Sequence, residues 1–188
     1  MEKNSNLTIP NILSVFRILL IPVFIITYFY IDNIDGYRVI PAVILGVSAL
    51  TDVVDGMIAR HYNQITQLGK IIDPLADKLS QFAMCVCLAV ENWQLIFFSL
   101  ILFGKELCFL IGGILISKKS INIPGAKWYG KVTTAVIFIS LFLITLLPKI
   151  PLLINTLTII SILLLIISFV LYMMEYMKLT GETNQYDM

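Results

Sequence analysis

Charged residues are scarce in this sequence. Aspartate, glutamate, lysine and arginine make up 13% of its 188 residues, whereas 59% are hydrophobic and the mean hydropathy is +0.92. Soluble globular domains carry roughly 25% charged residues, so a water-soluble enzyme is excluded. The charges also nearly cancel, leaving a net charge of +1. The strongly basic balance of a nucleic-acid-binding protein is therefore absent, and we expect no nucleic-acid partner.

Cysteine is equally sparse. Cys85, Cys87 and Cys108 all lie in apolar stretches, where a thiol usually behaves as a small buried hydrophobe. We therefore expect no disulfide and no thiolate metal site. The amino-terminal segment MEKNSNLTIPN is polar and lacks a cleavage site after an apolar run, so we expect it to belong to the mature protein.

Long apolar runs dominate what is present, and they predict an all-α integral membrane protein. A bilayer-spanning helix takes about 20 residues, and turn signals such as Asn33, Asp35 and Gly36 separate the runs. We expect one membrane domain over residues 1–188, with transmembrane helices at about 12–31, 37–61, 67–90, 94–117, 129–148 and 151–177.

The loop charges predict the orientation of these helices. With the amino terminus inside, eight lysines and arginines fall on the inner side and only Arg38 and Lys149 on the outer side. Basic loops stay in the cytoplasm, so both termini are expected there.

Four aspartates are expected inside the membrane. Asp52 and Asp55 are three residues apart, and Asp73 and Asp77 are four apart, so each pair lies on one face of its helix. The two helices are consecutive and must run antiparallel, so the pairs can meet near the cytoplasmic end. A charged residue at mid-membrane costs on the order of 2.5 to 3.5 kcal/mol, so the sequence must offset these charges.

Divalent cations would offset them. Four carboxylates carry about four negative charges, which two cations neutralise, and hard oxygen ligands suit Mg²⁺ or Mn²⁺. Two metals in one site act as a clamp for in-line displacement at phosphorus. We therefore predict a polar, metal-containing cavity near the cytoplasmic side, with Gly56 and Gly69 leaving room for a ligand or a helix.

Two other interpretations remain open at this point. The aspartates could form a buried salt-bridge network with Arg60, Lys78 or Lys105 in a channel or scaffold. A proton-coupled transporter also uses intramembrane acids, but it more often shows broken helices in two repeated halves, and no such repeat is evident here.

The spacing of the motif is itself distinctive. The pattern D-x2-D-G-x2-A-R-x8-G-x3-D-x3-D, from Asp52 to Asp77, resembles the signature of the CDP-alcohol phosphatidyltransferases without a departure, and the resemblance extends to TIPNILSVFRILLIPVF and to the whole chain. It implies CDP-diacylglycerol as the donor, a phospholipid and CMP as products, and a homodimer among membrane lipids. A bacterial plasma membrane, with the active site toward the cytoplasm, is the location we assume.

The resemblance also implies residue roles. The aspartates at 52, 55 and 73 would hold the metals, and Asp77 would complete the metal site and act as the general base. Asn11 and Arg17 are expected beside the nucleotide or lipid phosphate, although Arg17 could equally be a snorkelling anchor. The CDP-lipid site implied in this way comprises Asn11, Arg17, Asp52, Gly56, Ala59, Arg60 and Gly69.

Basic residues beyond the motif are expected to select the acceptor alcohol. They are Lys105, Lys118, Lys119, Lys127 and Lys131. Phosphatidylglycerolphosphate synthases typically carry Arg-Glu in helix four, a second Arg seven residues later, and Gly-Lys-x-Lys-Thr at helix five. This chain has Lys105-Glu106, then Gly112, and later Gly130-Lys131-Val132-Thr133-Thr134, so two cations are missing.

Those two absences favour a lipid acceptor. A phosphate monoester dianion needs concentrated positive charge, whereas the phosphodiester of phosphatidylglycerol carries one negative charge. The segment LCFLIGGILISKKSINIPGAKWYGKVTT also resembles cardiolipin synthases of the CDP-alcohol type. We therefore expect phosphatidylglycerol as acceptor, with glycerol 3-phosphate as the alternative. Another acceptor, such as inositol phosphate or serine, is the third and least favoured interpretation.

Overall fold

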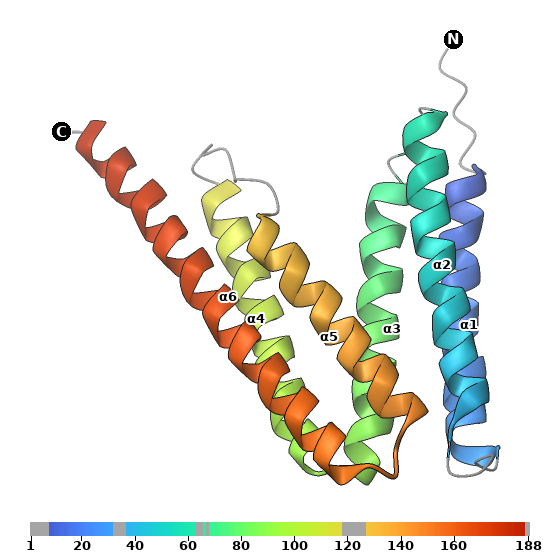
Figure 1. Cartoon of the computed structure of the whole chain (residues 1–188). Coiled ribbons are helices and arrows are strands. Elements are labelled where there is room, and N and C mark those ends of the chain that lie inside the picture. Colours follow the sequence, from blue (N-terminus) through green and yellow to red (C-terminus); the bar gives the residue numbers. More distant parts are fainter. Residues whose placement is uncertain (1–7, 32–36, 63–65, 67, 118–126, 187–188) are drawn as a thin grey trace. The chain divides into compact units, whose positions relative to one another are not determined.

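The computed structural model describes residues 8–31, 37–62, 66, 68–117 and 127–186 (Figure 1). The secondary-structure elements in these ranges are α-helices, which confirms the predicted all-α class. In chain order the helices are α1 (Ile9–Tyr30), α2 (Val39–His61), α3 (Gly69–Glu91), α4 (Gln94–Ser117), α5 (Trp128–Leu146) and α6 (Pro151–Tyr186).

Proline marks several helix boundaries. Pro10 lies in the first turn of α1, where its missing N–H costs no hydrogen bond, and α1 therefore begins three residues earlier than expected. Pro148 follows the end of α5, and Pro151 opens α6. Within helices, Pro22 lies in α1 and Pro74 in α3. The long α6 continues past residue 177 to Tyr186.

Four of these helices are long and apolar enough to cross a membrane: α1, residues 39–59 of α2, α5, and residues 151–175 of α6. No more than a third of the residues in each are buried within the protein, so most apolar side chains are left to contact lipid. These four are those among the fully described residues, and parts of α3 and α4 lie outside them; both helices also carry charges, at Asp77 and Lys105 for example. The six-span topology stays a prediction.

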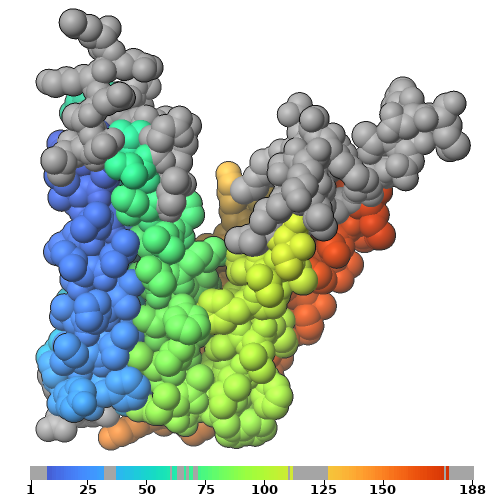
Figure 2. All heavy atoms as spheres, turned by 180° about the vertical axis from the view of Figure 1, so that it is seen from behind, coloured from blue at the N-terminus to red at the C-terminus, as the bar shows by residue number. Residues whose placement is uncertain are grey.

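The chain divides into two compact units. The first comprises the residues up to 91 together with 141–151. In it α1 packs against both α2 and α3, and Figure 2 shows α1 (blue) lying along α3 (green). Large apolar side chains fill the space between these helices, among them Phe24, Tyr28, Leu45, Met84 and Leu88.

A cluster of three side chains ties the first unit together at the end away from the aspartates. The Arg38 guanidinium lies 4.0 Å from the centre of the Tyr28 ring and donates hydrogen bonds to the Glu91 carboxylate, one of them at 2.6 Å. The Tyr28 hydroxyl donates to the same carboxylate at 3.2 Å. These contacts join α1, the start of α2 and the end of α3.

The second unit comprises residues 92–140 and those from 152 onward. Aromatic rings connect its helices. The centroid of Tyr172, on α6, lies 5.0 Å from that of Phe109 on α4 and 4.7 Å from that of Tyr129 on α5. A Cβ at Gly130 would overlap the Tyr172 hydroxyl, so glycine permits this close approach of α5 and α6.

A carboxylate cluster around Arg17

A buried arginine gathers three of the four motif aspartates. The Arg17 side chain, on α1, is 2% exposed. Its Nη1 atom lies 2.6 Å from Oδ1 of Asp52 and 2.5 Å from Oδ1 of Asp77, and its Nη2 atom lies 3.0 Å from Oδ2 of Asp55. One positive charge therefore contacts three negative ones.

Helix packing explains this arrangement. Asp52 and Asp55 share a face of α2 because they are three residues apart, and Asp77 lies on α3. Since α1 packs against both helices, a long side chain from α1 reaches both. A buried arginine needs such partners, because an unpaired charge in a low-dielectric interior is strongly destabilising. The ion-pair alternative raised from the sequence is thus partly realised, with Arg17 as its cation.

The fourth aspartate has a different partner. The hydroxyl of Ser14, one turn before Arg17 on α1, donates a hydrogen bond to Asp73. Ser14 is completely buried. Sequence reasoning missed this residue, although its position three residues before Arg17 places it on the same face of the helix.

Asn11 and Gly69 contact each other at the start of α3. The Asn11 amide donates to the Thr66 hydroxyl at 2.9 Å, and the Gly69 N–H donates to the same hydroxyl at 2.9 Å. A Cβ on Gly69 would lie 2.7 Å from Oδ1 of Asn11. The space predicted at Gly69 therefore accommodates a side chain of α1, and both residues hold the turn that precedes Asp73.

The remaining residues of the implied nucleotide site are only partly described. Gly56 and Ala59 lie half-buried in the last turns of α2, after the first aspartate pair. The Arg60 side chain lies outside the described residues, as do Lys118 and Lys119.

The other predicted acceptor lysines belong to the second unit and differ in their surroundings. The Lys105 ammonium lies 3.8 Å from Glu106 and 5.5 Å from the centre of the Phe109 ring. The Lys127 ammonium pairs with Glu175 at 2.7 Å. Lys131 is exposed and makes no ion pair with a described residue.

Glu175, which the sequence did not single out, connects two helices. It accepts a hydrogen bond of 2.9 Å from the Tyr129 hydroxyl in addition to its ion pair with Lys127. Its contacts cross from α6 to the start of α5, 46 or more residues away in the chain. No local sequence pattern predicts a contact between residues so far apart in the chain.

Three of the four carboxylates are gathered on one guanidinium, and the fourth accepts a hydrogen bond from Ser14. Among the described residues, no three aspartate, glutamate, histidine or cysteine side chains are spaced to hold an ion. The donor set nevertheless fits Mg²⁺ or Mn²⁺ chemically, since both prefer carboxylate oxygens. One arginine also neutralises only part of the charge of four aspartates.

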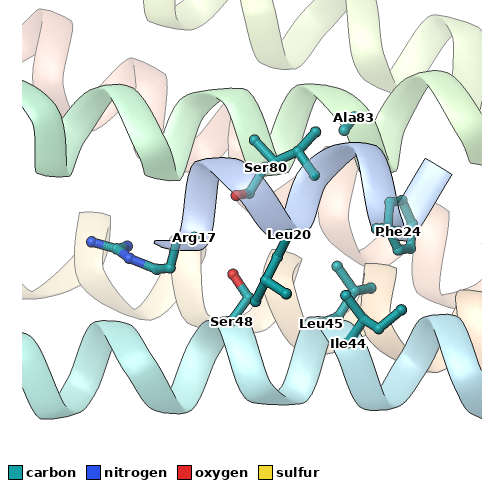
Figure 3. Close-up of a pocket in the computed structure, with 9 residues that line it drawn as sticks. Arg17, Leu20, Phe24, Ile44, Leu45, Ser48, Ser80 and Ala83 are labelled. Carbon is teal, nitrogen blue, oxygen red and sulfur yellow. The ribbon is translucent and has the colours of Figure 1, made fainter. Parts of the chain in front are cut away.

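A small apolar pocket adjoins Arg17 (Figure 3). It is a shallow hollow between α1, α2 and α3 that is partly open to the surroundings. The Arg17 side chain points away from Phe24 and Leu45, which line the pocket farther along the helices. Among the described residues that line it, Ser48 and Ser80 supply the hydroxyls. A charged cluster and an apolar pocket thus share one residue.

Comparison with known proteins identifies the family. The model of the CDP-alcohol phosphatidyltransferase family matches residues 7–167. The CDP-diacylglycerol–glycerol-3-phosphate 3-phosphatidyltransferase of Aquifex aeolicus is 34% identical over 92% of this chain and 98% of its own length.

Two further relatives match over shorter stretches. The enzyme of the same name from Rickettsia typhi is 48% identical over 38% of this chain and 39% of its own. The CMP-forming cardiolipin synthase of Streptomyces coelicolor is 31% identical over 68% of this chain and 60% of its own. The chain is therefore an integral membrane enzyme that belongs to the CDP-alcohol phosphatidyltransferase family.

Proposed function

We propose that this enzyme transfers a phosphatidyl group from CDP-diacylglycerol to glycerol 3-phosphate and releases CMP. The observation that carries the proposal is the similarity to the Aquifex aeolicus enzyme, which spans 98% of that protein's length. The cardiolipin synthase relative matches a smaller part of both chains. This reverses the order of the two acceptors that the missing cations had favoured.

Lys131 is the cation that we assign to the phosphate of the acceptor. It is exposed and has no ion-pair partner among the described residues, whereas Glu175 already neutralises Lys127. Phosphatidylglycerol is the second candidate acceptor, because Gly112 and Thr133 replace cations that glycerol 3-phosphate enzymes typically carry, and because one relative is a cardiolipin synthase.

The four aspartates are proposed to hold two divalent cations, Mg²⁺ or Mn²⁺. The bound cations would stabilise the negative charge that develops on the departing CMP phosphate. Asp77 would accept the proton of the acceptor hydroxyl as that oxygen attacks phosphorus, since a hydroxyl is a poor nucleophile while it keeps its proton. Gly56, Ala59 and Arg60 would border the nucleotide.

The surroundings of Arg17 suit an amphipathic substrate. Charged side chains lie at its guanidinium, and the apolar pocket lies beside its stem. A lipid whose head carries phosphate presents the same two chemistries side by side. We propose a cytoplasmic-facing site in a bacterial plasma membrane and a homodimeric enzyme.

Purified protein in lipid nanodiscs tests the reaction. It is incubated with CDP-diacylglycerol, Mg²⁺ or Mn²⁺, and one acceptor at a time, and both CMP and the lipid product are measured. We expect phosphatidylglycerolphosphate from glycerol 3-phosphate, and no CMP release in excess EDTA. If cardiolipin forms and phosphatidylglycerolphosphate does not, the acceptor is phosphatidylglycerol and not glycerol 3-phosphate. Full turnover in EDTA would contradict the proposed metal site.

The Asp55→Asn protein is the matched negative control for this assay. The introduced asparagine side chain is nearly isosteric with that of aspartate, but the cluster loses one carboxylate. We expect no CMP release from it while it remains in the membrane fraction.

A further inference from the structure

Arg17 has an incomplete set of partners for so buried a residue. Its Nη atoms contact three carboxylates, but its Nε–H is buried and has no hydrogen-bond partner among the residues that the structure describes. A buried donor without a partner destabilises the folded protein. The arginine therefore holds the carboxylates in an arrangement that leaves one of its own donors unused.

The arginine and the proposed metals compete for the same oxygens. Oδ1 of Asp52 and Oδ1 of Asp77 both lie on one nitrogen of Arg17, at 2.6 and 2.5 Å. A Mg²⁺ ion takes oxygen ligands at about 2.0 to 2.1 Å and demands near-octahedral geometry. These oxygens cannot surround an ion while the guanidinium lies between them.

We infer that Arg17 is the counter-ion of the carboxylates in the metal-free enzyme and that divalent cations displace it. This inference rests on the proposed two-metal function. Without metal, the arginine offsets part of the mutual repulsion of four negative charges. With metal, that task passes to the cations, and the guanidinium leaves the carboxylates.

The displaced guanidinium needs another anion. An arginine is always charged and carries five N–H donors in a fixed fork, so it cannot remain unpaired in a buried site. The phosphate groups of the CDP-lipid offer oxygens that match this fork, and one of them would also satisfy the Nε–H. Metal binding frees the guanidinium for the lipid phosphate, so it should favour CDP-lipid binding. Because coupling between two ligands is reciprocal, CDP-lipid binding should favour metal binding to the same extent.

Metal binding to variants of Arg17 tests the exchange directly, without measuring activity. Mn²⁺ affinity is determined by electron paramagnetic resonance on the purified unmodified protein and on Arg17→Gln. We expect Arg17→Gln to bind Mn²⁺ at least tenfold more tightly, because the competing cation is gone. Arg17→Lys, which keeps a charge but lacks the fork, should lie between the two.

Arg38→Gln is the matched control. Arg38 is also paired with a carboxylate in the first unit, but it lies at the opposite end of the helices and touches none of the motif aspartates. The change in net charge is identical. We expect its Mn²⁺ affinity to stay within about twofold of the unmodified protein, which separates local competition from a general effect of charge.

A second readout covers the case in which Arg17→Gln is unstable without metal. Thermal unfolding is followed for each protein in EDTA and in Mn²⁺. Arg17→Gln should unfold earlier in EDTA and gain more from Mn²⁺, since a tighter ligand stabilises more at equal concentration. The CDP-lipid should tighten Mn²⁺ binding in the unmodified protein and do so less in Arg17→Gln.

The outcomes distinguish this inference from the proposed function. Equal or weaker Mn²⁺ binding by Arg17→Gln, alongside normal binding by the unmodified protein, would overturn the exchange and leave the two-metal function standing. Failure of the unmodified protein to bind Mn²⁺ at all would reject the metals themselves, and the exchange with them.

Discussion

Asp52 and Asp77 contact the same nitrogen of Arg17 and are similarly accessible, with side chains 48% and 54% exposed. Asp55 is 5% exposed and touches the other nitrogen. Asp77 lies on α3, and the other two lie on α2. Because the acceptor must reach the proton-accepting group from outside the protein, an exposed carboxylate of the cluster is the suitable base. Asp52 and Asp77 both meet this condition and Asp55 does not, and Asp77 is the base proposed above.

Asp77→Asn should reduce turnover by about 10² to 10⁴, the usual contribution of a general base, while CDP-lipid binding changes less. Turnover is measured at saturating acceptor, lipid and Mn²⁺, and lipid binding is measured separately. Asp52→Asn is the comparison for loss of a metal ligand that contacts the same nitrogen, and we expect it to lower Mn²⁺ affinity together with turnover. Normal saturated turnover with lost CDP-lipid binding would make Asp77 a residue that positions the substrate.

Ser14 acts through Asp73. Its hydroxyl is buried and donates to that carboxylate, so Ser14→Ala leaves Asp73 without the contact that fixes its orientation. Loss of such a supporting hydrogen bond typically lowers metal affinity or activity by about 10- to 100-fold, and we expect a loss of Mn²⁺ affinity in that range. Ser99→Ala is the control. Like Ser14, Ser99 bonds the carbonyl four residues before it in its own helix, but among the described residues its hydroxyl contacts no aspartate. Equal Mn²⁺ affinity of the two variants would show that Ser14 does not support the site.

At the scale of helices, the turn before α3 positions the second aspartate pair. Gly69→Ala would place a methyl group 2.7 Å from Oδ1 of Asn11, so the buried Asn11 side chain, the turn or α1 must shift. Crowding of a packed site usually costs about 1 to 3 kcal/mol, and we expect a lower unfolding temperature together with reduced activity.

Two comparisons sharpen this prediction. Gly46→Ala, in α2, is the control, because a Cβ there meets nothing within 4 Å and alanine is the better helix former. Adding Asn11→Ala to Gly69→Ala removes the clash and should recover part of the lost stability. A Gly69→Ala protein as stable as Gly46→Ala would contradict the close approach of α1.

The sequence predicts the helices and the aspartate pairs well, because both are encoded locally. Charge-free runs and prolines place six helices, and spacings of three and four residues place Asp52 with Asp55 and Asp73 with Asp77. The partners of those aspartates are not encoded locally. Arg17 and Ser14 reach them only because of the way α1 is rotated against α2 and α3, and residue spacing within one helix carries no such information.

At the scale of the whole molecule, we expect acceptor choice to depend on charges in the second unit. The structure changes the meaning of two positions there, through burial at Thr133 and through an ion pair at Lys127. Thr133 stands where the Gly-Lys-x-Lys-Thr segment typical of phosphatidylglycerolphosphate synthases would place its second lysine, but it is 3% exposed and its hydroxyl donates to the carbonyl of Tyr129. A threonine here therefore serves the packing of α5, and its presence says less about the acceptor than the sequence suggested. Lys127 is likewise committed to Glu175.

Lys131→Gln should therefore weaken the binding of glycerol 3-phosphate more than Lys127→Gln does. A charge-assisted hydrogen bond contributes about 1.5 to 3 kcal/mol, which corresponds to roughly 10- to 100-fold in affinity, so we expect KM for glycerol 3-phosphate to rise in that range. Lys127→Gln removes the same charge from the same helix start, but its ammonium is already neutralised, and KM should change by less than about threefold. Assays with phosphatidylglycerol add a further comparison. Because this lipid carries a single negative charge, its KM should rise less in Lys131→Gln than the KM of the glycerol 3-phosphate dianion. If both lysine variants raised KM equally, the exposed position of Lys131 would not be what selects the acceptor, and the ion pair with Glu175 would have to open during the reaction.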